Sequence, residues 1–220
     1  MTDAPAAEDA DGLHQGLATY LGALASGAPT PGGGSAAGMA GALGAALVSM
    51  VANFTVGRPK FAAADTALRE VLAGAEGARQ RLMALTQEDE RAYATLSAAM
   101  KLPREDEAQR RARSQAMQQA LRGATAPPLA MATVCREVLD LAQGAAEQGN
   151  PALASDAGAA ALLAEAALQA SAINVRVNLA RVRDQAFVER STIRLNRMLE
   201  GTATLKEAIV AMASRRMSGG

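Results

Sequence analysis

Apolar residues recur with a helical period along most of the chain. Leucines and a tyrosine fall at intervals of three and four between Leu17 and Leu24, which predicts a first amphipathic helix that ends near Gly27. Residues 29–34 then combine two prolines with three consecutive glycines, a composition that excludes a helix. Ser35 is a favourable N-cap residue, so we expect a second helix to begin there.

This second predicted helix is uncharged from Ser35 to Gly57, a length that could also span a bilayer. Alanine and glycine supply much of its apolar character, and Ser49 and Asn53 interrupt it. We therefore favour a helix buried at the centre of a bundle, in which the glycines at 38, 41 and 44 permit close backbone approach.

Prolines divide the middle of the chain. A long periodic segment covers residues 62–102 and ends at Pro103, and a highly charged helix is predicted over 104–124. The pair Pro127-Pro128 is expected to separate that helix from an amphipathic one, which closes before Gly149.

The last third of the chain predicts two more helices. Ser155 can cap a second nearly uncharged helix over 156–179, and a final amphipathic helix covers about 184–217. The predicted fold class is all-α: residues 1–220 form one domain, an antiparallel helical bundle with helices 35–57 and 156–179 buried at its centre.

Composition supports this fold and narrows the function. Aromatic residues make up 2% of the chain and good helix formers dominate. The 22 basic and 22 acidic residues cancel, which argues against nucleic acid as a partner. A lone cysteine, Cys135, excludes an internal disulfide, lacks a histidine partner nearby in sequence and is expected to be a buried, inert thiol. Without a His/Cys cluster, no metal site is expected.

The N-terminal segment bears on localisation. Residues 1–12 are acidic and lack both the basic and the apolar region of a secretory signal. We therefore expect a cytoplasmic protein with no membrane partner.

Asp89 is the most informative candidate for chemistry. It occupies the heptad position that Leu68, Ala75, Leu82 and Leu96 otherwise fill, so its carboxylate should face the core or a cleft, whereas its two glutamate neighbours should face solvent. A buried carboxylate commonly has a raised pKa, which suits a general acid or base. An ion pair with an arginine of a neighbouring helix is the structural alternative.

A glycine turn and several polar residues complete the candidates. Gly32, Gly33 and Gly34 with Ser35 would present backbone N–H groups at a helix N-terminus to an electron-rich ligand, or form only an entry turn. The cations Arg58 and Lys60 follow the uncharged helix, where they bind a carboxylate or merely cap it. Asp156 begins the second uncharged helix, Glu165 lies within it, and Asn174 and Asn178 share one of its faces.

Most of these residues, though not Asp89 or Glu165, fall in segments that resemble the cyclodeaminase/cyclohydrolase family. The family includes the C-terminal domain of formiminotransferase-cyclodeaminase and bacterial methenyltetrahydrofolate cyclohydrolases. Its pattern is matched by the proline-glycine block, by the Ser-Asp-Ala-Gly sequence and by further segments along nearly the whole chain: residues 28–37, 44–53, 55–60, 102–103, 134–142, 149–151, 155–158 and 172–178. Pro59 departs from the pattern, since a basic residue is expected there.

The resemblance implies a helical enzyme, at least dimeric, that acts on tetrahydrofolate and needs no other cofactor. For this chemistry we propose Asp89, on the strength of its heptad position, as the catalytic acid or base, with Asp156 and Lys60 as catalytic helpers across a common cleft. The substrate-binding residues that the resemblance implies are Gly32, Gly33, Gly34, Ser35, Asn53, Arg58, Asn174 and Arg176.

Two family reactions, and one non-catalytic role, remain open at this point. A methenyltetrahydrofolate cyclohydrolase adds water to the carbon that bridges N5 and N10, whereas a formiminotetrahydrofolate cyclodeaminase closes the ring and releases ammonia. Both need a proton donor and acceptor, for which carboxylates suffice. We favour the cyclohydrolase, because no transferase domain accompanies this chain to make the formimino compound. A helical scaffold that assembles through small-residue faces would bind no folate.

Overall fold

A computed structural model describes residues 7–218 of the chain, and of residues 7–15 and 218 only the backbone. The described part is helical, without strands, which confirms the predicted all-α class. Its elements, with η marking short 3₁₀ helices, are α1 (Ala7–Leu24), α2 (Gly33–Asn53), η1 (Pro59–Ala64), α3 (Asp65–Met100), α4 (Glu107–Gln148), η2 (Pro151–Leu153), α5 (Ala154–Leu179), α6 (Gln185–Leu199) and α7 (Thr202–Ser218).

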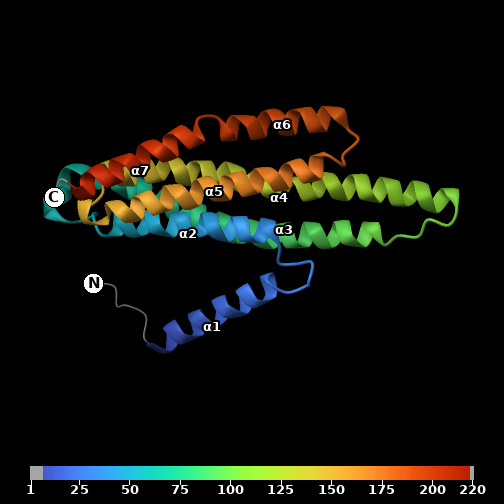
Figure 1. The fold of residues 1–220 in the computed structure, drawn as a ribbon, viewed down its shortest axis with the longest axis horizontal. Coiled ribbons are helices and arrows are strands. Elements are labelled where there is room, and N and C mark those ends of the chain that lie inside the picture. The colour runs from blue at the N-terminus through green and yellow to red at the C-terminus, as the bar shows by residue number, and fades with distance from the viewer. Residues whose placement is uncertain (1–6, 219–220) are drawn as a thin grey trace.

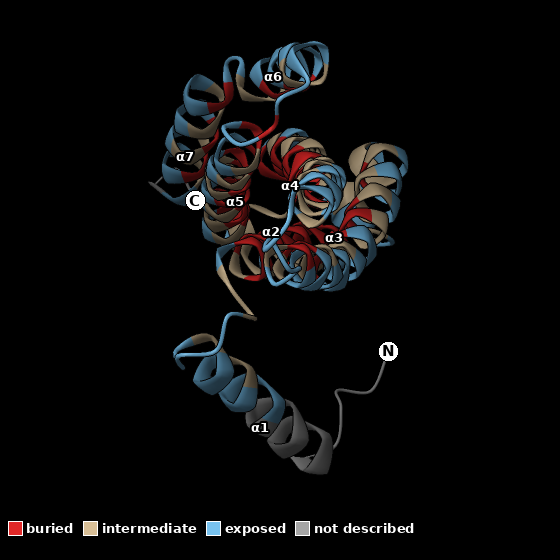
Figure 2. Ribbon diagram, turned by 90° about the vertical axis from the view of Figure 1, so that its right-hand side faces the viewer, coloured by how far each residue is buried: buried red, intermediate tan, exposed pale blue. Residues whose placement is uncertain are grey.

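The longest helices, α2, α3, α4 and α5, form the body of the molecule (Figure 1). Helix α2 packs against α3 and α5, and α4 packs against the same two helices from the opposite side. Helix α7 covers α5 and part of α4, and α6 lies against α4 and α5. The buried residues face the interior between these helices (Figure 2).

Small residues let the central helices approach closely. A Cβ atom built on Gly38 would lie 2.3 Å from Oγ1 of Thr86, and one on Gly41 would lie 2.8 Å from Sγ of Cys135. On the α5 side, a Cβ on Gly44 would lie 3.1 Å from the carbonyl oxygen of Ala160. These contacts confirm the close packing predicted for the uncharged helix, because a larger side chain would force the helices apart.

Helix α4 corrects the prediction of a break at Pro127-Pro128. It runs without interruption from Glu107 to Gln148, with both prolines buried inside it. Proline has no N–H, so Pro128 leaves the carbonyl of Ala124, four residues earlier, without its helical donor. The side-chain amide of Asn178 on α5 donates to that carbonyl at 2.7 Å. A tertiary contact thus replaces the hydrogen bond that the proline removes.

Other helix boundaries also differ from the prediction. The N-cap of α2 is Gly32 rather than Ser35, and that of α5 is Leu153 rather than Ser155. The predicted last helix is two helices, because Gly201 adopts a φ of +71° and turns the chain between α6 and α7. Only glycine takes this left-handed conformation readily.

Two of the described helices, Gly33–Asn53 and Pro151–Leu179, are long and apolar enough to cross a membrane by length and composition. In the bundle, 61% and 50% of an apolar 18-residue stretch in each of these helices is buried. Both helices therefore contribute buried residues to the core of the bundle.

Helix α1 stands apart from the bundle in both views (Figures 1 and 2). Its side chains Leu17 and Leu21 are exposed. At its C-terminal end, the hydroxyl of Tyr20 lies 3.0 Å from Oγ of Ser35, so the helix reaches the start of α2.

Candidate active site

The N-terminus of α2 meets a carboxylate from the middle of α3. A Cβ atom built on Gly34 would lie 2.1 Å from Oδ2 of Asp89, so only glycine leaves room for this side chain. The first N–H groups of a helix lack helical partners and carry the positive end of its dipole. The fold therefore places the predicted catalytic residue Asp89 against the predicted glycine turn.

Burial raises the pKa of the Asp89 carboxyl above its usual value, and the neighbouring charge of Glu90 raises it further. The positive end of the α2 dipole acts in the opposite direction. A carboxyl group under these opposing influences can take up a proton and return it.

Asp89 forms no salt bridge within the part of the chain that the structure describes. Its hydrogen-bonding capacity is also unused there, since the described residues include no donor to its carboxylate. The structural alternative, an ion pair with an arginine of a neighbouring helix, is therefore wrong. A half-buried carboxylate without a partner is costly, which favours a role toward a ligand.

A short hydrogen-bonded chain borders Asp89. The Ser35 hydroxyl donates to Oε1 of Glu90 at 3.1 Å and lies 3.0 Å from the Tyr20 hydroxyl. The expectation that Glu90 faces solvent was wrong, because its side chain turns toward the start of α2. The sequence pattern did not identify Glu90 or Tyr20 as site residues. Glu90 directly follows the heptad aspartate, and Tyr20 lies on the apolar face of the first helix.

Helix α5 contributes Asn174 to the same site. A Cβ on Gly33 would lie 3.9 Å from its Nδ2, so the side chain borders the glycine turn. Nδ2 donates to the carbonyl of Ala170 at 2.9 Å, which leaves Oδ1 able to accept a hydrogen bond from a ligand. Arg176 is exposed in the last turn of α5. Asn178 instead donates its side-chain hydrogen bond to the carbonyl of Ala124 on α4.

The remaining predicted site residues lie at the other end of the bundle. Helices α2 and α5 are antiparallel, with Gly33 beside Asn174 and Gly44 beside Leu163. Asn53 ends α2, about 28 Å from Gly34 along the helix axis. Arg58 and the exposed Lys60 follow it, and Asp156 begins α5 at the same end.

Within one chain, Asp156 and Lys60 therefore do not assist Asp89 across a common cleft. That prediction is wrong for the single subunit, because antiparallel packing sends the start of α5 to the end of α2. Two other side chains lie apart from Asp89: Cys135 is buried, with a pKa raised by desolvation to about 12, and Glu165, about 14 Å from Asn174 along α5, accepts a hydrogen bond from Gln169.

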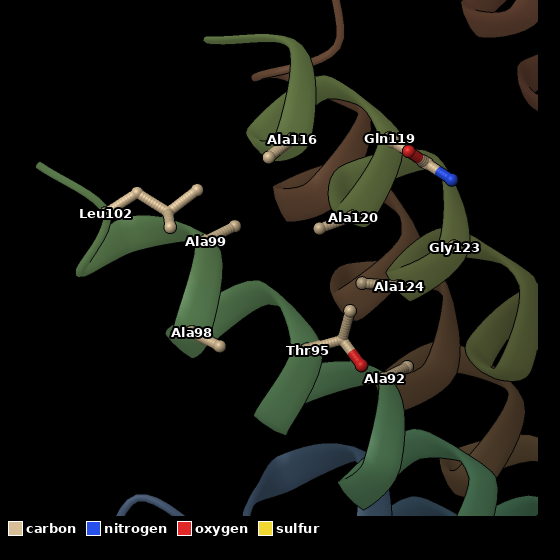
Figure 3. A pocket seen from close by; sticks show the side chains of 10 residues that line it. All are labelled: Ala92, Thr95, Ala98, Ala99, Leu102, Ala116, Gln119, Ala120, Gly123 and Ala124. Carbon is tan, nitrogen blue, oxygen red and sulfur yellow. The ribbon is translucent and has the colours of Figure 1, made fainter. Parts of the chain in front are cut away.

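An apolar groove begins one helical turn beyond Asp89. It has a volume of about 530 Å³ and lies between α3 and α4, from Ala92 to Leu102 on one side. Figure 3 shows Ala99 and Ala120 pointing toward one another across it. Thr95 and Gln119 are the polar side chains that line it. The groove offers apolar contact surface, and none of the residues that line it is an acid or base.

A family model described as formiminotransferase-cyclodeaminase matches residues 16–197 of this chain. The chain belongs to the formiminotransferase-cyclodeaminase family. The match includes the glycine turn and the helices that bring Asp89 and Asn174 to it. The resemblance inferred from the sequence motifs is confirmed.

Known proteins in the formiminotransferase-cyclodeaminase family match most of this chain but differ in how much of their own length the match covers. A methenyltetrahydrofolate cyclohydrolase from Methylorubrum extorquens is 43% identical over 196 residues, 89% of this chain and 94% of that protein. A formimidoyltransferase-cyclodeaminase from Sus scrofa is 35% identical over 192 residues, 87% of this chain but 36% of that protein. The solved structure of a formiminotetrahydrofolate cyclodeaminase from Thermotoga maritima matches with a TM-score of 0.75 at 28% identity, covering 92% of this chain and 96% of that one.

Proposed function

We propose that this protein is a methenyltetrahydrofolate cyclohydrolase, which converts 5,10-methenyltetrahydrofolate and water into 10-formyltetrahydrofolate. The observation that carries the proposal is the unpaired, half-buried Asp89 carboxylate against Gly34. The Methylorubrum extorquens cyclohydrolase supports the choice of reaction, since that protein and this chain match over nearly their full lengths.

The proposed reaction uses Asp89 twice. Its carboxylate first takes a proton from water as the oxygen attacks the cationic methenyl carbon. It then returns this proton to N5 as the bond between N5 and the carbon breaks. The added hydroxyl loses its proton to solvent and becomes the formyl oxygen on N10. A carboxyl whose pKa is raised toward the working pH suits both steps.

The residues around Asp89 have matching roles toward the substrate. The carboxylates of Asp89 and Glu90 stabilise the positive charge of the methenyl group. The backbone at Gly33 and the Oδ1 atom of Asn174 offer a donor and an acceptor to the polar pterin. Neither carboxylate forms a salt bridge among the described residues, so both remain available.

Cyclodeamination is the second candidate, supported by the likeness to the Thermotoga maritima cyclodeaminase. The same carboxylate could take the proton from N10 and deliver it to the departing ammonia. Purified protein incubated with methenyltetrahydrofolate, and in parallel with formiminotetrahydrofolate, separates the two reactions. Loss of the methenyl absorbance above the buffer rate supports the cyclohydrolase, and ammonia release supports the cyclodeaminase. Absence of both activities and of folate binding would instead favour a scaffold.

The proposal includes a cytoplasmic location and no cofactor beyond the folate substrate. The residues that the structure describes hold no group of three or more potential metal ligands, and the proton transfers above require only carboxylates. No nucleic-acid or membrane partner is proposed.

A homodimer is the final part of the proposal. Leu43 on α2 and Leu162, Ile173 and Val177 on α5 are exposed apolar side chains. Leu43 lies midway along α2. A two-fold axis that passes near Leu43 and perpendicular to α2 would bring the end of α2 in one copy to the start of α2 in the other. Lys60 and Asp156 of the partner subunit would then approach Asp89.

Mixing two inactive variants tests this arrangement. Asp89→Asn and Lys60→Ala proteins, unfolded together and refolded, should regain about a quarter of parental activity if each site combines residues of two subunits. The same treatment of either variant alone is the control. Light scattering that gives a monomer mass would refute the dimer, and no recovery in a mixed dimer would refute the shared site.

A further inference from the structure

A second site is indicated by an arginine-lined cavity at the end of the bundle where α3 joins α4. The cavity has a volume of about 410 Å³ and is lined by four arginines together with Ser114, Met117 and Gln118: Arg104, Arg110, Arg113 and Arg183. Arg104 belongs to the α3–α4 connection, and Arg183 to the α5–α6 connection. Its α4 side lies near Met100, about 17 Å from Asp89 along α3.

Neutral acceptors hold these guanidinium groups in place. Arg113 donates to the carbonyl of Met100 at 3.1 Å, and Arg183 donates to Oγ of Ser114 at 3.0 Å. Arg110 donates to the carbonyl of Glu105 at 3.0 Å. Because carbonyl and hydroxyl oxygens carry no net charge, the positive charge of each arginine stays uncompensated.

Three of the carboxylates near the cavity are engaged elsewhere, whereas the side chain of Glu105, in the α3–α4 connection, pairs with none of the described residues. Oδ1 of Asp106 caps α4 by accepting from the N–H of Gln109, and Glu107 pairs with Arg111. Asp184 caps α6 in the same way. None of the residues that line the cavity is acidic. In a chain whose charges cancel overall, this concentration of unpaired arginine is a local excess that an anion would neutralise.

We propose that this cavity binds a multivalent anion, with two or more carboxylate or phosphate groups, through Arg104, Arg110 and Arg183. Guanidinium groups match both oxyanions with paired N–H donors, and several fixed donors favour a ligand with several charged groups over a single ion. Two sources carry this chemistry: a chain of linked glutamates on the folate substrate, and a free polyphosphate compound. Only the first depends on the proposed function.

Direct binding tests the site without any turnover. Inorganic triphosphate and a free tri-γ-glutamate peptide are titrated into the parent and into Arg110→Gln/Arg183→Gln by calorimetry. We expect at least a tenfold weaker Kd in this variant for whichever probe binds. Arg113 is left intact because it ties α4 to the end of α3. Arg197→Gln/Arg215→Gln, on α6 and α7, removes the same charge away from the cavity and should keep the parental Kd.

The variant Arg110→Lys/Arg183→Lys controls for misfolding of the glutamine variant, because lysine keeps the positive charge but lacks the paired N–H donors of arginine. It should bind more weakly than the parent and more tightly than the glutamine variant. Equal Kd values in the parent and the glutamine variant for both probes, no binding of either probe to the parent, or an equal loss in the Arg197/Arg215 control would overturn the proposal.

The source follows from which probe binds. If the peptide binds, KM for a triglutamated methenyltetrahydrofolate should rise at least fivefold in Arg110→Gln/Arg183→Gln while KM for the monoglutamate stays unchanged. Binding of triphosphate alone, with both KM values unchanged, assigns the cavity to a free phosphate compound. A protein without cyclohydrolase activity that still binds a probe would refute the proposed function and leave this site standing.

Discussion

Replacing Asp89 by asparagine tests the candidate site most directly. The substitution keeps the shape of the side chain beside Gly34 but removes its ability to exchange a proton. A positioned general acid or base contributes roughly 10²–10⁴-fold to rate. The smallest of these effects, a hundredfold, corresponds to about 2.7 kcal/mol of activation free energy. We therefore expect kcat to fall by at least about a hundredfold.

The same substitution should not destabilise the fold. Burial and Glu90 raise the pKa of Asp89 in the folded protein, so the ionised carboxylate costs folding free energy at neutral pH. Asparagine removes that cost. The difference in Tm between variant and parent should be zero or positive at neutral pH. It should shrink as pH falls through the folded pKa, and vanish below the unfolded value of about 3.9, where both states of the parent are protonated.

Loss of the methenyl absorbance, corrected for the rate in buffer, measures turnover on the same preparation used for melting. Glu88→Gln is the matched control, because it removes one negative charge from the exposed residue directly before Asp89. It should retain parental kcat. A folded Asp89→Asn protein with kcat within a few-fold of the parent would refute general acid/base catalysis by Asp89. A lower Tm with normal turnover would instead identify a structural role.

Three further changes test the surroundings of Asp89 and the packing of α4. Glu90→Gln removes a charge that raises the pKa of Asp89, so the limb of the pH profile of kcat/KM that reports Asp89 should move to lower pH. A limb that does not move would contradict the assignment of that limb to Asp89. Gly34→Ala should lower kcat at least tenfold by displacing the Asp89 carboxylate, whereas Gly77→Ala, which meets open space, should stabilise α3 by about 0.5–1 kcal/mol and keep full activity. Asn178→Ala leaves a carbonyl of α4 without its donor and should cost about 1–3 kcal/mol of unfolding free energy in denaturant titrations, with kcat unchanged; equal stability would show that water replaces the amide.

Much of the fold could be predicted from the sequence, because helix formation and helix ends depend on residues that are close together along the chain. Apolar residues at helical spacing located the long helices, and the glycine turn fixed where α2 begins to within a few residues. The heptad position of Asp89 predicted that its carboxylate turns inward, since side chains seven apart share one face of a helix. Family motifs then indicated folate chemistry, which periodicity could not supply.

Tertiary structure decided what depends on contacts between distant segments. Pro127 and Pro128 predict a break by their own chemistry, yet α4 continues, and Asn178, far away in sequence, replaces one of the two hydrogen bonds that the prolines remove. Likewise, a one-dimensional pattern cannot tell which ends of two helices lie together. Antiparallel packing of α2 and α5 places Asn174 beside Gly33 and sends Asp156 about 27 Å away along α5, so the composition of the site was set by the bundle's topology.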